Sequence, residues 1–124
     1  MALRILVVDD DMHERRSLAL GLRIAGFSAV EAQSGADALT LLETRTFDLV
    51  ITDLVMAGLS GVQLARLLHE RFPDLPVVLT SGYELGRRQI ERAGLSLLAF
   101  VPKPYDLADL TGFLHEKFAR LATG

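Results

Sequence analysis

The stretch "ILVVDDD", residues 5–11, decides the fold, because four apolar residues run directly into three consecutive aspartates. A continuous apolar run of this kind is typical of a strand buried on both faces of a parallel sheet. Neighbouring carboxylates repel one another, so a fold tolerates Asp9, Asp10 and Asp11 at the end of a buried strand only where a cation offsets their charge. The stretch therefore predicts an internal strand with a cation-binding site at its carboxyl end.

Similar apolar runs recur along the chain, and segments with helical periodicity lie between them. Strands are expected over residues 3–8, 28–32, 47–52, 76–81 and 97–103, and helices over residues 12–25, 34–45, 61–72, 84–94 and 105–121. The most apolar runs, at residues 3–8, 47–52 and 76–81, are expected at the centre of a sheet, and the mixed run at residues 28–32 is expected at an edge. Because parallel strands need crossover connections, the alternation predicts an α/β fold: a single-domain, doubly wound, five-stranded parallel sheet with five helices.

The composition is that of a small, mildly acidic chain. Its 124 residues, half of them hydrophobic, fit one domain over residues 1–124 with no output domain. The absence of cysteine excludes disulfides, thiolate zinc sites and cysteine catalysis, and the net charge of −3 gives no electrostatic case for nucleic-acid binding. No apolar run approaches the length of a membrane span, and the N-terminal run is too short for a secretory signal. A cytoplasmic location is therefore expected.

The residues that follow the expected strands are chemically related. In an open parallel sheet, ligands bind beyond the carboxyl ends of the strands. The polar residues at these ends are, in chain order, Asp9, Asp10, Asp11, Asp53, Thr80, Ser81 and Lys103. Carboxylates that converge from two adjacent strands favour a hard divalent cation, and Mg²⁺ suits a site that also binds phosphate. Carboxylates, Mg²⁺, a lysine and a hydroxyl together are typical of phosphoryl transfer. Asp53 stands alone at its strand end and is the best nucleophile candidate, whereas the Asp9/Asp10 pair is better placed to hold metal.

Four motifs carry a resemblance to a known family. In order, "VVDDD", "DLVITDLVMAGLSG", "LPVVLTSGY" and "FVPKPYD" resemble the receiver domain of two-component response regulators, and the resemblance covers essentially the whole chain. It implies a flavodoxin-like sheet with the strand order 2-1-3-4-5.

The resemblance also implies a role for each site residue. Asp53 is the phosphoacceptor, which takes a phosphoryl group from a phosphohistidine on a partner. Asp10, supported by Asp9, binds Mg²⁺ together with Asp53 and the backbone carbonyl of Val55. Lys103 pairs with a phosphoryl oxygen.

Further positions follow from the same comparison of motifs. Ser81, rather than Thr80, aligns with the switch hydroxyl, and Phe100 aligns with the aromatic residue that moves inward after phosphorylation. The bond between Lys103 and Pro104 aligns with a cis peptide. The helix expected at residues 84–93 is weakly apolar, so the movement is expected there.

Two positions depart from the family pattern. Receivers usually have proline four residues after the phosphoacceptor, where this chain has Ala57, and the loop is therefore expected to be less pre-set. Gly82 replaces the usual alanine and is expected to open access to the site.

The function implied is a signalling module more than an enzyme, because a receiver catalyses only its own phosphorylation and dephosphorylation. The implied partners are a sensor histidine kinase or histidine phosphotransfer domain and a downstream effector or linked domain, with no nucleic acid and no membrane. A dimer through the face of the fourth and fifth helices is a further expectation. The chain is either a stand-alone receiver or a domain of a longer regulator or hybrid kinase.

Two alternatives come from other classes. Haloacid-dehalogenase-type phosphotransferases place an aspartate nucleophile after the first strand in a D-x-D pattern, which Asp9 and Asp11 match. Such enzymes also carry a cap domain, for which 124 residues leave no room. A flavodoxin-like cofactor binder needs a phosphate-cradling loop after the first strand, and this sequence has none there.

Overall fold

Five parallel strands form one sheet in the order β2-β1-β3-β4-β5 in the computed structural model, which describes residues 3–82, 88, 91–92 and 94–123. The strands are β1 (Arg4–Val8), β2 (Ser28–Ala32), β3 (Leu49–Asp53), β4 (Val77–Ser81) and β5 (Ala99–Pro102). The predicted parallel sheet and its strand order are confirmed. β2 lies at an edge, and the three most apolar strands lie inside, as expected from their composition.

Four helices are present in the described part of the chain: α1 (Met12–Ile24), α2 (Gly35–Thr44), α3 (Gly61–Arg71) and α5 (Leu107–Thr123). Five helices were expected. The remaining one, at residues 84–94, lies mostly outside the described residues. No helix among the described residues is long and apolar enough to cross a membrane.

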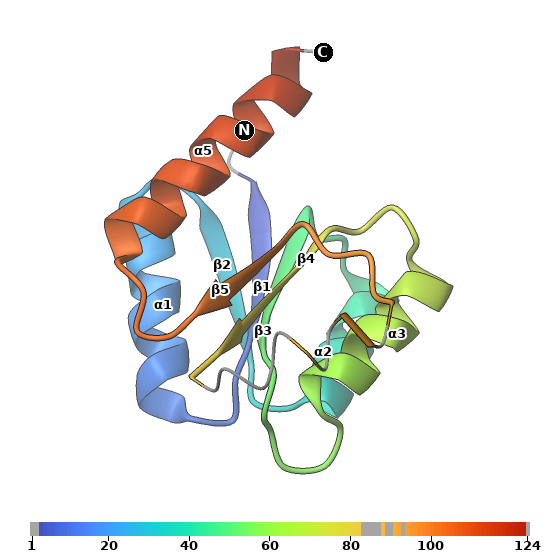
Figure 1. Ribbon diagram of the computed structural model, residues 1–124. Coiled ribbons are helices and arrows are strands. Elements are labelled where there is room, and N and C mark those ends of the chain that lie inside the picture. The colour runs from blue at the N-terminus through green and yellow to red at the C-terminus, as the bar shows by residue number, and fades with distance from the viewer. Residues whose placement is uncertain (1–2, 83–87, 89–90, 93, 124) are drawn as a thin grey trace.

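The helices cover both faces of the sheet, α1 and α5 on one side and α2 and α3 on the other (Figure 1). Alternate residues of each strand point to opposite faces. In β1, Leu6 and Val8 pack with α2 and α3, whereas Ile5 and Val7 pack with α1 and α5. All four side chains are almost fully buried, which explains why the run is apolar without interruption.

Polar side chains define where the helices begin. Asp11 is the N-cap of α1, and its Oδ1 accepts a hydrogen bond of 3.1 Å from the backbone N–H of Glu14. Ser34 caps α2 in the same way. Ser60 and Gln63 form a reciprocal capping box at the start of α3. The third aspartate of the opening stretch therefore has a structural role.

Gly61 brings the start of α3 against the end of β3. Its backbone N–H donates to the carbonyl of Leu54 at 2.9 Å, and a Cβ atom at this position would collide with the backbone of Asp53 and Leu54. Only glycine allows this approach. The contact fixes the loop that follows Asp53.

The expected bounds of β2 are confirmed, and the other four strands differ from expectation by one or two residues at one or both ends. β3 begins at Leu49. Asp48 precedes it and bonds twice to Arg4: its backbone N–H donates to the Arg4 carbonyl at 2.8 Å, and its side chain accepts a hydrogen bond of 2.8 Å from the Arg4 N–H. The Phe47 ring lies under the Arg4 guanidinium. β3 also extends to Asp53, so the predicted phosphoacceptor is the last residue of the strand.

Candidate functional site

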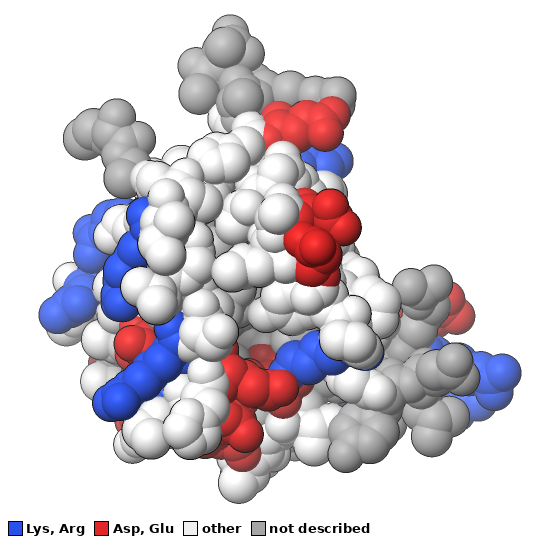
Figure 2. Space-filling model, turned by 90° about the vertical axis from the view of Figure 1, so that its left-hand side faces the viewer, with Lys and Arg blue, Asp and Glu red and all other residues white. Residues whose placement is uncertain are grey.

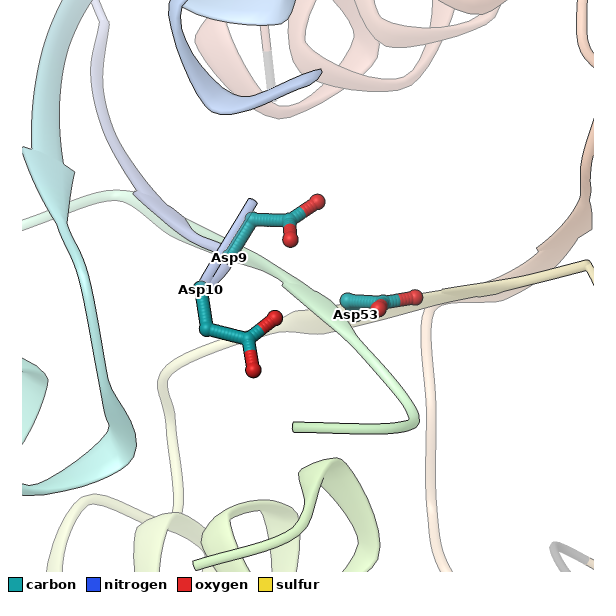
Figure 3. Close-up of side chains that lie close together, drawn as sticks. All are labelled: Asp9, Asp10 and Asp53. Carbon is teal, nitrogen blue, oxygen red and sulfur yellow. The ribbon is translucent and has the colours of Figure 1, made fainter. Parts of the chain in front are cut away.

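Three carboxylates meet beyond the carboxyl ends of β1 and β3. Asp9 and Asp10 directly follow β1, Asp53 ends β3, and the two strands are neighbours in the sheet. One oxygen from each of the three side chains lies within 4.8 Å of the others, and Figure 3 shows the three carboxylates side by side. The sheet topology therefore produces the acidic cluster that the sequence predicts.

Lys103 reaches this cluster from the residue after β5. Its Nζ lies 3.3 Å from Oδ1 of Asp53 and 3.6 Å from Oδ2 of Asp9. Its backbone N–H donates to the carbonyl of Ser81 at 2.7 Å, which ties the end of β5 to the end of β4. The Lys103–Pro104 peptide bond is cis, the geometry that the resemblance implies. The Lys103 ammonium thus lies among carboxylates from two strands.

Burial and neighbouring charges both shift the pKa values of Asp9, Asp53 and Lys103. Burial raises the pKa values of Asp9 and Asp53 above the ordinary value, and the nearby Lys103 only partly opposes this rise. Burial alone lowers the pKa of Lys103, but its hydrogen bond with Glu14 and the charges of Asp53 and Asp9 outweigh burial and raise it. The site therefore keeps its lysine charged and has more negative charge than one lysine offsets.

Asp10 has a backbone partner in the loop after β3. Its Oδ2 accepts a hydrogen bond of 3.0 Å from the backbone N–H of Ala57. The usual proline of the family pattern has no N–H and could not make this bond. The substitution by Ala57 therefore adds a donor to the site, which sequence reasoning missed because it considered only the stiffness of the loop.

Two hydroxyls lie at the end of β4. Thr80 is the register partner of Asp53, and Ser81 is the register partner of Pro102 on β5. Both side chains are buried. Thr80 lines the cavity beside Asp53, and the assignment of Ser81 as the switch hydroxyl stays a prediction.

The remaining predicted residues differ in their exposure. Val55, whose backbone carbonyl is the expected metal ligand, is two residues past Asp53 with an exposed side chain. Phe100 is half-buried and packs against the core on the α2 and α3 side of the sheet. Among the described residues, a Cβ atom at Gly82 would meet one neighbour, the Cβ of Lys103, at 4.0 Å.

Sequence reasoning missed two residues on α1. The Oε2 of Glu14 lies 2.8 Å from Nζ of Lys103. Arg15 is mostly buried; its Nη1 donates to the backbone carbonyl of Asp9 at 2.9 Å, and its Nε pairs with Glu31 at 3.2 Å. An acidic residue three positions after a helix cap is common, so nothing in the residue pattern indicates a second role for Glu14.

A cavity of about 800 Å³ opens beside Asp53 on the side of the sheet covered by α1 and α5. Figure 2 views this side, and acidic and basic side chains lie together at a hollow near its lower edge. The polar lining includes Asp9, Glu14, Asp53, Thr80 and Lys103. The acidic cluster is thus open to a ligand from outside.

The donor set fits a hard divalent cation. Three carboxylates with converging oxygens are ligands that Mg²⁺ prefers, and a divalent cation would neutralise the excess negative charge. The site also has the groups that phosphoryl transfer to a carboxylate oxygen requires. They are a carboxylate at the mouth of a cavity, a lysine within 3.3 Å of it and a cation site beside it.

Comparisons with known proteins agree with this geometry. The profile of the family described as "Response regulator receiver domain" matches residues 5–115. The chain is 37% identical over 112 residues to the response regulator MprA of Mycobacterium sp. (strain KMS), which covers 89% of this chain and 48% of that protein. The chain therefore spans about half the length of that relative.

Solved structures show the same fold over nearly the whole chain. A response regulator receiver protein from Pseudomonas putida has a TM-score of 0.85 at 30% identity, covering 94% of this chain and 98% of that one. The response regulator TrrA of Thermotoga maritima, solved in complex with Mg²⁺ and BeF, has a TM-score of 0.83 at 29% identity, with the same coverage.

Proposed function

The chain belongs to the response regulator receiver domain family, and from this membership we propose that it accepts a phosphoryl group on Asp53 and switches conformation to control a partner or linked domain. The observation that carries the proposal is the position of Asp53. Its carboxylate, at the end of β3, lies beside the acidic pair that follows β1 and 3.3 Å from the Lys103 ammonium that follows β5.

Mg²⁺ is the cation that we assign to the site. Asp9, Asp10, Asp53 and the backbone carbonyl of Val55 would hold it, and the converging oxygens of the three carboxylates support this assignment. When bound, Mg²⁺ supplies positive charge that offsets the charge on the carboxylates and on phosphoryl oxygens. The neighbour solved with Mg²⁺ and BeF supports the same assignment.

The phosphoryl transfer is a displacement at phosphorus. A carboxylate oxygen of Asp53 attacks in line and forms a P–O bond, the P–N bond of the phosphohistidine breaks, and its electron pair returns to the imidazole. Lys103 pairs with a phosphoryl oxygen and stabilises the charge there. Its Nζ already lies 3.3 Å from the attacking carboxylate, which supports this role.

The conformational response shifts a population of existing states. The phosphoryl group attracts the Ser81 hydroxyl, and Phe100 moves inward from its half-buried position. The new contacts with the anion supply the free-energy difference between the two states.

The proposed partners are a sensor histidine kinase or histidine phosphotransfer domain and a downstream effector. The length of the relative MprA, about twice that of this chain, supports control of a linked domain. A cytoplasmic location, no direct contact with nucleic acid and a dimer through the face of the fourth and fifth helices complete the proposal. The protein would catalyse phosphorylation and dephosphorylation of its own Asp53 and turn over no metabolite.

Incubation with acetyl phosphate and Mg²⁺, followed by intact-mass spectrometry, tests this function. We expect the wild-type mass to increase by one phosphoryl group, and we expect no increase with EDTA or in Asp53→Asn. Asp74→Asn, an exposed aspartate outside the cavity, is the matched control and should be modified normally. Unchanged wild-type mass, or full modification of Asp53→Asn, would contradict the proposal.

A further inference from the structure

Among the described residues, the carboxylate nearest to Lys103 lies outside the acidic cluster. Glu14 Oε2 is 2.8 Å from Nζ of Lys103, whereas the nearest oxygens of Asp53 and Asp9 are 3.3 Å and 3.6 Å away. Only the Glu14 contact has the length of a strong charge-assisted hydrogen bond. The lysine that is assigned to the phosphoryl group therefore makes its shortest contact with the carboxylate of Glu14.

The position of Glu14 is fixed by the start of α1. Its backbone N–H is bonded to the N-cap Asp11, so the residue lies in the first turn directly beyond the acidic pair. The side chain lines the same cavity as Asp53 and Thr80. An anion that approaches Asp53 through this cavity encounters Glu14 on the way.

Glu14 also differs from the other partners of Lys103 in its exposure. Its side chain is 52% exposed, compared with 14% for Asp53 and 9% for Asp9. An exposed carboxylate regains water when it leaves its partner, so the pair costs little to break. The Glu14 side chain can turn to solvent, whereas the two aspartates stay in place.

We propose that Glu14 is a positioning residue that holds Lys103 in the unphosphorylated protein, competes with the incoming phosphoryl group for its ammonium, and so weakens the binding of phosphoryl donors. The inference rests on the proposed function of Asp53. An incoming phosphoryl oxygen takes the place of Glu14 Oε2 on Nζ, and the carboxylate moves into water. Because of this contact, phosphorylation requires a higher concentration of the phosphoryl donor than it would if Lys103 had no bond to Glu14.

The concentration dependence of phosphorylation by acetyl phosphate tests this competition. In Glu14→Gln, we expect the half-saturating concentration to fall about 2- to 5-fold, as the loss of an exposed ion pair predicts, with the maximal rate unchanged. Glu43→Gln removes the same charge from an exposed position of α2, outside the cavity, and should match the wild type.

A shorter acidic side chain at position 14 distinguishes the direct contact with Lys103 from the effect of negative charge alone. Glu14→Asp keeps the negative charge at the mouth of the cavity but lacks the methylene that brings the carboxylate to 2.8 Å from Lys103. We expect it to behave like Glu14→Gln. If Glu14→Asp instead matches the wild type, long-range repulsion explains the effect and the proposed contact is wrong.

A readout without metal or donor completes the test. In the presence of EDTA, the ¹³Cε resonance of Lys103 should shift in Glu14→Gln and stay in place in Glu43→Gln. Suppose that the wild type is phosphorylated but Glu14→Gln shows no shift of the Lys103 resonance or an unchanged half-saturating concentration. The role of Glu14 is then wrong, and the proposed function of Asp53 stands. A wild type that takes up no phosphoryl group overturns the proposed function, and the role of Glu14 falls with it.

Discussion

The carboxylate of Asp53 has opposing effects on stability and function. A carboxyl group whose pKa is raised in the folded state destabilises the fold when ionised; this cost is absent below the ordinary pKa and complete above the raised one. At neutral pH the metal-free protein bears this cost, while phosphoryl transfer needs the same ionised group. Stability is therefore given up at the residue that carries the chemistry.

Asp53→Asn should raise the thermal midpoint of the protein in EDTA. The substitution removes a desolvated charge and leaves Lys103 with Glu14 and Asp9 as partners. We expect a rise of roughly 2–5 °C, because each kcal/mol shifts the midpoint of a domain of this size by a few degrees. Calorimetry measures it, with Asp74→Asn as the exposed control. A lower midpoint would show that the ionised carboxylate stabilises the fold.

Ala57→Pro tests the backbone contact with Asp10. Proline removes the N–H that donates to Oδ2 at 3.0 Å, so the carboxylate loses an orienting partner. Isothermal titration calorimetry should show that Ala57→Pro binds Mg²⁺ roughly 2- to 10-fold more weakly than the wild type. This effect is smaller than the roughly 10- to 100-fold that is usual for the loss of a partner of a metal ligand, because the hydrogen bond is exposed. Ala57→Gly keeps the N–H and should bind Mg²⁺ as the wild type does. Equal affinities in all three proteins would leave this hydrogen bond without a role.

The two hydroxyls of β4 can be separated by substitution. Ser81→Ala should abolish the change in amide exchange at residues 82–94 that Mg²⁺ and beryllofluoride induce in the wild type, because the hydroxyl that follows the anion is gone. Thr80→Val keeps the side-chain shape and should preserve the change. The opposite pattern would assign the switch to Thr80, the register partner of Asp53.

At the scale of single elements, the approach of α3 to β3 depends on Gly61. Gly61→Ala places a Cβ against the backbone of Asp53 and Leu54, and we expect a loss of about 1–3 kcal/mol in the free energy of unfolding. A Cβ at Gly112, in α5, would meet no atom of the described residues within 4 Å, so Gly112→Ala should stabilise by about 0.5–1 kcal/mol. Urea denaturation compares them. A neutral Gly61→Ala would mean that the start of α3 can move away.

The element types could be predicted because hydrophobic periodicity is a local signal. The apolar runs that were expected at the centre of the sheet are buried strands. The boundaries were less accurate because contacts distant in sequence set them. Phe47 and Asp48 looked like the start of a strand, but both interact with Arg4 and precede β3.

At the scale of the whole molecule, the convergence of Asp9, Asp10 and Asp53 could be predicted because parallel topology brings strand ends to one edge. The contact between Glu14 and Lys103 could not, because it joins residues 89 positions apart through a side-chain conformation. The partner of Asp10 was missed for a similar reason, since a backbone N–H leaves no trace in the residue type. Long-range side-chain contacts thus set the details of a site whose location the sheet determines.

The location of the phosphoryl group shows which of the three carboxylates is the nucleophile. Borohydride reduction of the protein treated with acetyl phosphate and Mg²⁺ converts the phosphorylated aspartate to homoserine, which peptide mass spectrometry locates. We expect homoserine at position 53. Homoserine at position 9 or 10 would place the nucleophile after the first strand, and Asp53 would then not be the phosphoacceptor.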